Sequence, residues 1–281
     1  MWPSLLRHFL KCLPNVIVRA PIATHAGCVQ CGMGQTTPFS GHGSRNVAED
    51  PRPNTLQLNT EGFTENKISV IEQLAFKNKA FIIVLQETHC TTADKLVIPN
   101  FSPAGSILSR NHSLAMFVHE RLEWSLVDQS PEQSETEWLC VDVTGYKITN
   151  VYKPPHLRFT PTAIPKFSRP SLYVGNFNWQ HVNWGYNTTS LDGETLDSWA
   201  TSNNLGLLYN LKETTSFFSR HWNVGANPDL AFTSFGQDSR LPDTHVLGKF
   251  PWSQHRSSLI NPKIQGSCPQ RSGEALELSQ G

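Results

Sequence analysis

The sequence predicts an α/β fold in which two β-sheets pack face to face and helices lie outside them. Short apolar runs recur through the middle of the 281-residue chain, bounded by turn residues, and neighbouring runs often have no helix between them. Only two or three segments there carry apolar residues at helical spacing. Many strands with few helices favour a sandwich of two sheets.

The middle of the chain begins with "TLQLNTEG", where Leu56 and Leu58 alternate with polar residues as in a short strand. Thr64 is a suitable N-cap for a helix at about 64–78 with one apolar face. Residues 81–85 are continuously apolar, which is typical of a buried strand. Further strands are predicted at 114–119, 137–143, 146–152 and 171–175 and in "LGLLYN", "TTSFFS" and "NPDLAFTS", with a second helix at 192–204.

Composition divides the chain into three zones. Residues 1–53 are rich in Gly, Ser, Pro and His without sustained periodicity, and we expect a disordered leader. Residues 54–260 form the predicted domain. Residues 261–281 are polar, and we expect a flexible tail.

The start of the chain bears on localisation. The first 48 residues contain no Asp or Glu but do contain Arg and Lys, which is compatible with a mitochondrial presequence. Pro3, Pro14 and Pro21 interrupt any long helix, so a leader without a targeting role is the favoured interpretation. The six scattered cysteines form no disulfide framework and indicate a reducing, intracellular compartment, either nuclear or cytoplasmic.

Charge and cysteine spacing limit the partners. The 23 basic and 23 acidic side chains balance, so no general attraction to nucleic acid or to anionic membrane is expected. No run approaches the ~18 apolar residues of a membrane span. A single CxxC occurs at 28–32, which His25 and His42 could complete as a zinc set, but the spacing fits no common zinc module. Loose thiols are the favoured interpretation.

Polar side chains follow several predicted strands, where binding and catalytic groups collect in α/β proteins. In "SLYVGNFNWQHVNWGY" (171–186), a strand runs into a glycine and then into Asn176 and Asn178. The other members of this set are Asn59, Glu87, Tyr152, Asp229 and His255. Each has an ordinary alternative as a turn asparagine, a surface acid or a loop histidine. The set in this order is more specific than any one member.

The set resembles the endonuclease/exonuclease/phosphatase superfamily, which includes deoxyribonuclease I and the apurinic/apyrimidinic endonucleases. More narrowly, the amino-acid sequence around these residues is similar to the endonuclease domain of non-LTR retrotransposons of the LINE or jockey type. The similar stretches are "LQLNTEG", "IIVLQETH", "NVYKPP", "LYVGNFNWQHVNWGY", "DGETLDSWATSNNLGLLYN", "NPDLAFTS" and "SQHRSS", which span about residues 55–260. The resemblance implies a deoxyribonuclease I-like sandwich, DNA as the partner, and phosphodiester hydrolysis with Mg²⁺ or Mn²⁺.

The resemblance also implies roles for single positions. Asn59 and Glu87 match the pair at the metal site, with Glu87 holding Mg²⁺. Tyr152 matches a tyrosine that contacts the scissile phosphate. Asp229 matches the aspartate that steadies the catalytic histidine, and His255 matches that histidine, which stabilises the phosphate in the transition state.

Two positions depart from the family pattern. Asn178 matches the asparagine of the "GDFN" motif, but Asn176 stands where that motif has the aspartate that orients or deprotonates water. Gln254 stands where many relatives have an aspartate near the metal. An amide accepts no proton at neutral pH, and general-base catalysis is typically worth about 10²–10⁴-fold. Glu87 alone is expected to hold Mg²⁺ weakly, so catalysis is predicted to be impaired.

Two functions stay open. The first is an Mg²⁺-dependent endonuclease-like domain of retrotransposon origin with impaired catalysis. The second is a non-enzymatic remnant that binds nucleic acid or a protein partner through the same cleft. A related phosphodiesterase that acts on small esters or lipids is disfavoured, because the similar sequence stretches match the retrotransposon endonuclease domain. Such endonuclease domains normally precede a reverse transcriptase, and none follows here, so we expect a translated fragment of an inserted element.

Overall fold

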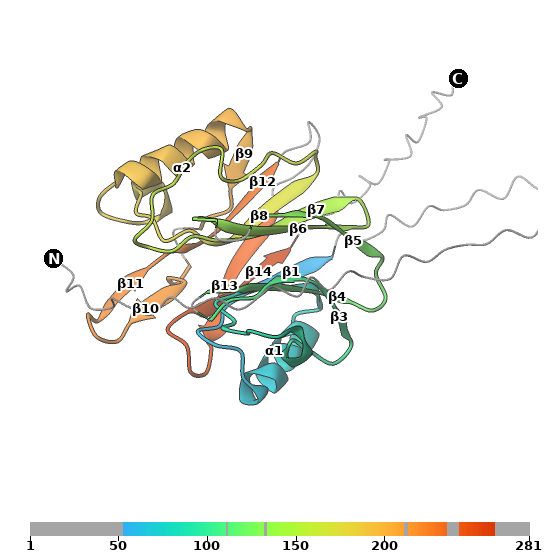
Figure 1. Cartoon of the computed structure of the whole chain (residues 1–281). Helices are drawn as coiled ribbons and strands as arrows, with labels where there is room; N and C mark the ends of the chain where they lie inside the picture. The colour runs from blue at the N-terminus through green and yellow to red at the C-terminus, as the bar shows by residue number, and fades with distance from the viewer. Residues whose placement is uncertain (1–52, 111, 132–133, 211–212, 235–241, 262–281) are drawn as a thin grey trace, which may run out of the picture. The chain divides into compact units, whose positions relative to one another are not determined.

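The computed structural model describes residues 53–110, 112–131, 134–210, 213–234 and 242–261, and it confirms the predicted two-sheet α/β sandwich (Figure 1). The predicted leader and tail lie outside the described residues except for Pro53 and Asn261, and the CxxC at 28–32 lies outside them too. In the described ranges, no helix has the length and apolar character needed to cross a membrane. Cys90 and Cys140 are buried free thiols.

Each of the two main sheets has six strands. The first has the order β13-β14-β1-β2-β4-β3, with β1 (Asn54–Asn59), β2 (Ala80–Gln86), β3 (Phe101–Ile107), β4 (Leu114–His119), β13 (Asp243–Lys249) and β14 (Arg256–Asn261). The second has the order β5-β6-β7-β8-β12-β9, with β5 (Trp124–Gln129), β6 (Glu137–Val143), β7 (Tyr146–Tyr152), β8 (Ser171–Asn176), β9 (Leu205–Leu207) and β12 (Asp229–Ser234). The pairs β1–β2 and β7–β8 are parallel, and the other neighbours are antiparallel.

The remaining elements are two α-helices, two short 3-10 helices and a hairpin. They are α1 (Glu65–Lys77), α2 (Leu191–Ser202), η1 (Ala93–Lys95), η2 (Val182–Trp184), and the hairpin strands β10 (Phe217–Ser219) and β11 (Val224–Ala226). Helix α1 lies against the outer face of the first sheet and α2 against the outer face of the second (Figure 1). The predicted layers are therefore confirmed.

Helix boundaries differ slightly from the sequence prediction. Helix α1 follows Thr64, the expected N-cap, although the Thr64 side chain makes no capping hydrogen bond. Helix α2 begins at Leu191, because the Ser190 hydroxyl accepts a hydrogen bond from the Gly193 N–H at 3.0 Å. It ends before the predicted residue 204, because the Asn203 N–H bonds back to carbonyls of the last turn. Capping, rather than apolar spacing, sets both ends.

Strand β2 explains the apolar run at 81–85, because both of its faces are buried. Ile82 and Val84 face the second sheet and pack in a cluster with residues of β6, β7 and β8. Ile83 and Leu85 face the other way, into a cluster with Ile71 of α1. A central strand covered on both sides has no polar face and therefore no alternation.

A third apolar cluster lies between the second sheet and α2 and is mostly aromatic. Tyr173, Trp179, Trp184 and Trp199 are buried in it. The Lys153 side chain is also fully buried there, with its Nζ 4.5 Å from the centroid of a Trp179 ring. Nζ has no hydrogen-bond partner among the described residues. Burial lowers the pKa of Lys153 from 10.5 to about 8.

Three buried amides join the two sheets. Gln57 Nε2 of β1 donates to Gln86 Oε1 of β2 at 3.2 Å. Gln86 Nε2 donates across the interface to Asn150 Oδ1 of β7 at 2.7 Å. Asn150 Nδ2 donates back to the Leu85 carbonyl at 2.9 Å. Each amide is buried and paired, so this polar bridge costs little free energy inside an otherwise apolar interface.

Candidate active site

The topology brings the predicted site residues to one edge of the sandwich. Asn59 is the last residue of β1, and Glu87 directly follows β2. The sequence interpretation also placed Asp229 and His255 after strands, and that was wrong: Asp229 is the first residue of β12, and His255 directly precedes β14. Strand β12 runs antiparallel to β8, and β14 runs antiparallel to β1. The starts of these strands therefore meet the ends of their neighbours.

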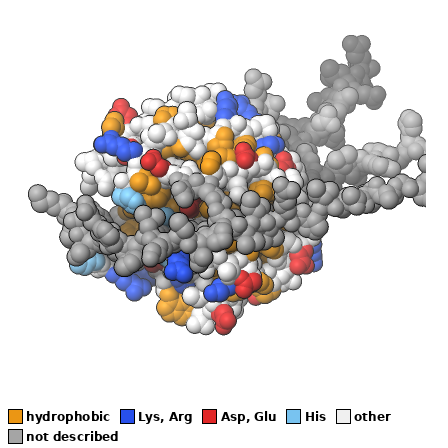
Figure 2. Space-filling view, in the orientation of Figure 1, with side chains coloured by type: hydrophobic (Ala, Val, Ile, Leu, Met, Phe, Trp, Pro, Cys, Tyr) orange, Lys and Arg blue, Asp and Glu red, His pale blue; other side chains and the backbone are white. Residues whose placement is uncertain are grey.

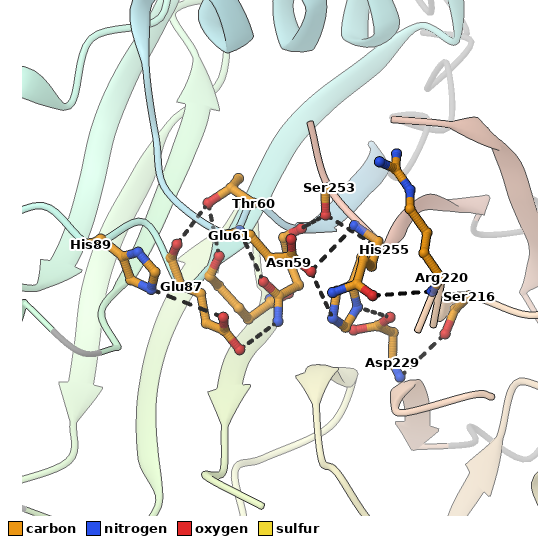
Figure 3. A network of polar contacts seen from close by, with 12 residues as sticks. Asn59, Thr60, Glu61, Glu87, His89, Ser216, Arg220, Asp229, Ser253 and His255 are labelled. Atoms are coloured by element: carbon orange, nitrogen blue, oxygen red, sulfur yellow. Dashed lines mark hydrogen bonds and ion pairs between the residues drawn. The ribbon is translucent and has the colours of Figure 1, made fainter. Parts of the chain in front are cut away.

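Asp229 and His255 form a buried pair that joins the two sheets (Figure 3). The His255 Nδ1 lies 2.7 Å from Asp229 Oδ2, and the exposed fractions of the side chains are 7% and 0%. Burial alone would lower the pKa of His255, but the Asp229 carboxylate raises it, and the net pKa lies above the ordinary 6.5. Because Asp229 holds Nδ1, the Nε2 atom is left for another ligand. The Phe217 ring, 4.8 Å away between centroids, packs on the imidazole.

Glu87 and Asn59 are linked directly. Asn59 Nδ2 donates to Glu87 Oε1 at 2.8 Å, so the amide orients the carboxylate (Figure 3). The Thr60 hydroxyl donates to the Glu87 carbonyl at 3.0 Å and holds the backbone, which has a φ of 50° at Glu87. His89 Nε2 lies 4.0 Å from the second carboxylate oxygen of Glu87. The carboxylate is therefore held in place and still 20% exposed.

Glu61 belongs to the same group, although the sequence interpretation did not include it. Its Oε1 accepts a hydrogen bond from the Gln254 N–H at 3.3 Å and lies 3.9 Å from His255 Nε2 (Figure 3). The buried Lys67 fixes the loop by donating to the carbonyls of Thr60 and Glu61 at 2.6 and 3.2 Å. The signal in the sequence was an acid two residues past Asn59 in "NTEG".

Tyr152 and Asn176 lie beside this group through strand pairing. Tyr152 is paired with Asn176 in the parallel β7–β8 ladder, and Asn176 is paired with Asp229 in the antiparallel β8–β12 ladder. Burial and the nearby Glu87 carboxylate raise the pKa of Tyr152, so its hydroxyl stays protonated. Asn176 is 1% exposed, and its Oδ1 has no hydrogen-bond partner within the described ranges. A buried amide oxygen next to Tyr152 and Asp229 in the strand ladders is an acceptor available at the site.

Gly175 lets β8 approach β7 closely. A Cβ at this position would lie 1.8 Å from the Val151 carbonyl oxygen, so no other residue fits without moving the strand. The glycine before Asn176 is therefore a packing requirement of this strand pair.

The side chains of Gln254 and Asn178 are turned to other partners. Gln254 Oε1 accepts from the Arg220 N–H of the β10–β11 hairpin at 3.4 Å, and its own N–H reaches Glu61. Asn178 has a φ of 54°, and its Nδ2 donates to the Lys153 carbonyl at 2.9 Å. Both contacts hold loops that border the group of acids, and neither brings the side chain onto a carboxylate.

The donor atoms fit a hard divalent cation that shares its coordination with substrate. In the described part of the chain, no three His, Cys, Asp or Glu side chains are close enough to hold a metal by themselves. Glu87, Glu61 and the amide of Asn59 nevertheless offer oxygen ligands at one place (Figure 3). Mg²⁺ is usually bound by one or two carboxylates together with water and substrate phosphates. These are the residues that would hold such a cation, and a substrate phosphate would complete its coordination.

Comparison with known proteins agrees with this geometry at the level of the fold. No protein-family model matches the chain, and no curated protein matches it in sequence. A solved endonuclease domain of TRAS1, a telomere-specific non-LTR retrotransposon, superposes with a TM-score of 0.60 at 18% identity, covering 77% of this chain and 100% of that one. An AP endonuclease from Archaeoglobus fulgidus gives a TM-score of 0.58 at 11% identity, covering 76% and 100%.

A third solved structure was determined with nucleic acid. The 3' phosphatase NExo from Neisseria, bound to a product DNA hairpin, superposes with a TM-score of 0.58 at 15% identity. It covers 76% of this chain and 100% of that one. Identities this low establish the shared architecture and nothing finer. The chain has the endonuclease/exonuclease/phosphatase fold.

Proposed function

We propose that this domain binds DNA and hydrolyses its phosphodiester bonds with a divalent cation, and that the hydrolysis is impaired. The observation that carries the proposal is the convergence of two carboxylates, a buried Asp–His pair and a tyrosine at one edge of a nuclease-like fold. These are Glu61, Glu87, Asp229, His255 and Tyr152. Retrotransposon origin is part of the proposal and rests on the sequence resemblance and the likeness to the TRAS1 domain.

Each group has a chemical task in phosphoryl transfer. Glu87, Glu61 and Asn59 would hold Mg²⁺ or Mn²⁺, which polarises the phosphoryl oxygens when bound. His255 directs Nε2 toward the negative charge that grows on the phosphate, and Asp229 orients the imidazole and raises its pKa, which favours the form that donates from Nε2. The protonated hydroxyl of Tyr152 can donate to the same phosphate.

The missing group is a base for the attacking water. Asn176 occupies the position between Tyr152 and Asp229 in the strand ladders, and its buried Oδ1 is unpaired within the described ranges. An amide oxygen can orient water by accepting a hydrogen bond, but it cannot take the proton. With no base at this position, the rate of hydrolysis would be lower by about 10²-fold or more.

DNA contacts have local support only. On the coloured part of the face in Figure 2, which grey atoms partly cover, basic and acidic side chains are interspersed. The β10–β11 hairpin beside His255 carries the exposed Arg220, His221 and Trp222. A cation and an exposed indole are the groups that contact phosphates and unstacked bases. We therefore expect weak DNA binding with a shallow dependence on salt.

The test is nicking of supercoiled plasmid in Mg²⁺ or Mn²⁺. Wild-type protein should nick at a rate near background, and Asn176→Asp should nick about 10²-fold faster because a base is restored. Glu87→Ala in the repaired protein should remove the gain. Asn204→Asp, the same change on an exposed residue after α2, is the matched control and should change nothing.

Two results would count against this account. If wild type nicks as fast as Asn176→Asp, the base does not belong at this position. If the repaired protein is folded and binds DNA but never nicks, the non-enzymatic binding function replaces the hydrolytic one. Metal binding by Asn176→Asp, measured by calorimetry, distinguishes a lost metal site from a lost base.

A further inference from the structure

A concave site lies far from the candidate active site, between α1 and the opposite ends of β2, β3 and β4. It is a groove of about 620 Å³, within the range of small-molecule sites. Ala80 and Phe81, which begin β2, border it, whereas Glu87 follows the other end of the same strand. At about 3.3 Å per residue, roughly 20 Å separate the groove from Glu87. The groove is thus independent of the proposed nuclease function.

The floor and wall of the groove are aromatic. The His119 ring lies between Phe81 and Phe101, with centroid distances of 5.3 and 5.2 Å and interplanar angles of 57° and 72°. Phe76, on the outward face of α1, is 88% exposed at the wall of the groove. A phenyl group this exposed gains nothing from the fold, and large exposed apolar side chains beside a concavity mark binding sites. These rings offer faces and edges to a flat apolar ligand.

The charged lining residues favour an anion. Lys79 and Arg121 are exposed lining residues of the groove, and neither forms an ion pair with any residue in the ranges that the structure describes. The acid that lines the groove, Glu72, is engaged by the Asn100 side chain at 3.4 Å. The groove therefore has two cationic side chains without an ion-pair partner in the described ranges, Lys79 and Arg121, and one acidic side chain, Glu72, which is hydrogen-bonded to Asn100.

We propose that this groove binds a small aromatic anion, a flat apolar body that carries one carboxylate, sulfonate or phosphate group. The ring system packs against Phe76, Phe81 and His119, and the anionic group lies between Lys79 and Arg121. Aromatic packing supplies most of the affinity, and the cations supply the preference for an anion over a neutral molecule of the same shape.

The test uses two fluorescent probes that share one ring system, the anion anilinonaphthalene sulfonate and the neutral N-phenylnaphthylamine, with the full chain. The anion should saturate at one site per chain and bind more tightly than the neutral probe. Lys79→Gln combined with Arg121→Gln should weaken the anion about tenfold and leave the neutral probe within about twofold. Phe76→Ser should weaken both probes.

Matched variants remove the same groups elsewhere. Lys95→Gln combined with Lys166→Gln deletes two exposed cations, and Leu191→Ser deletes an exposed apolar side chain that is 65% accessible. Neither should affect either probe. All variants should unfold cooperatively in urea. That result would show that each variant is folded, so that differences in probe binding come from the groove and not from unfolded protein.

Three results would overturn the proposal. The first is many probe molecules per chain without saturation, and the second is equal weakening of both probes by the Lys79/Arg121 variant. The third is a dimer in sedimentation that becomes a monomer on Phe76→Ser, which would assign the groove to a second copy of the chain.

Discussion

Replacing Lys153 with methionine should stabilise the domain at neutral pH. Lys153 is fully buried beside Trp179, its Nζ has no hydrogen-bond partner in the described ranges, and burial lowers its pKa from 10.5 to about 8. At 1.36 kcal/mol per pKa unit, that change corresponds to about 3 kcal/mol of destabilisation of the charged form. The cation–π contact with Trp179 is lost in the variant, which offsets about 1 kcal/mol. Methionine fills a similar volume. The net gain is therefore about 2 kcal/mol at pH 7.

The pH dependence identifies the cause. The cost of the buried charge is fully present below pH 8, where Lys153 is protonated in both the folded and the unfolded chain. It disappears as the pH rises through the unfolded pKa of 10.5, where both states are neutral. The wild-type free energy of unfolding should thus rise relative to that of Lys153→Met between about pH 8 and 10.5.

Urea unfolding at pH 7 and above pH 10 measures this difference. At pH 7 the variant should gain about 2 kcal/mol, equivalent to a rise in melting temperature of about 4–8 °C for a domain of this size. Lys95→Met, at an exposed position in η1, is the matched control and should change stability by less than about 0.5 kcal/mol. A destabilised Lys153→Met, or a gain that is equally large above pH 10.5, would refute the reasoning.

Three further changes test other features. Gly175→Ala should cost about 3 kcal/mol or more in urea unfolding, because a Cβ would lie 1.8 Å from the Val151 carbonyl oxygen; a neutral change would contradict the β7–β8 contact. Ser190→Ala should cost about 1 kcal/mol by removing the α2 cap, whereas Thr64→Ala, whose side chain makes no capping bond, should cost much less; equal losses would contradict this. Asn176→Asp should lower the melting temperature in EDTA, because a buried carboxylate is added beside Asp229, and Mg²⁺ should restore it; an effect of Mg²⁺ on wild type of the same size would argue against this.

Much of the fold could be predicted, because its central strands are defined by local patterns. The continuous run at 81–85 becomes β2, covered on both faces, and the strands at 137–143 and 146–152 are recovered with the predicted bounds. Strand β5 was missed because all six of its residues are exposed, so it has no buried face to leave an apolar period. Its existence depends on pairing with β6, which is a tertiary contact.

The sequence identified most residues of the candidate site, but it did not show how the strands that carry them run relative to one another. Asn59, Glu87 and His255 were selected on the resemblance to a known family, and the structure brings them close to one another. Sequence alone did not show that the start of the Asp229 strand meets the end of the Asn176 strand, because that meeting depends on antiparallel pairing. Glu61 was missed because a single acid in a turn reads as a surface residue, and its proximity to His255 depends on a contact between segments far apart in the chain.

The amide bridge between Gln86 and Asn150 lies beside the candidate active site, whose members are divided between the two sheets. Glu87 and His255 come from the first sheet, whereas Asp229 comes from the second. Apolar packing is non-directional, so an interface of Ile, Val and Leu alone would tolerate small sliding of one sheet over the other. A hydrogen bond of 2.7 Å tolerates little displacement.

The bridge residues are also near neighbours of the site residues along the chain. Gln86 directly precedes Glu87, and Asn150 stands two residues before Tyr152 on its strand. Any shear between the sheets would strain this bridge together with the Asp229–His255 contact, which has the same length of 2.7 Å. The buried amides therefore restrain the position of one sheet relative to the other. The contact between Asp229 and His255 depends on that same relative position, although neither residue belongs to the amide bridge.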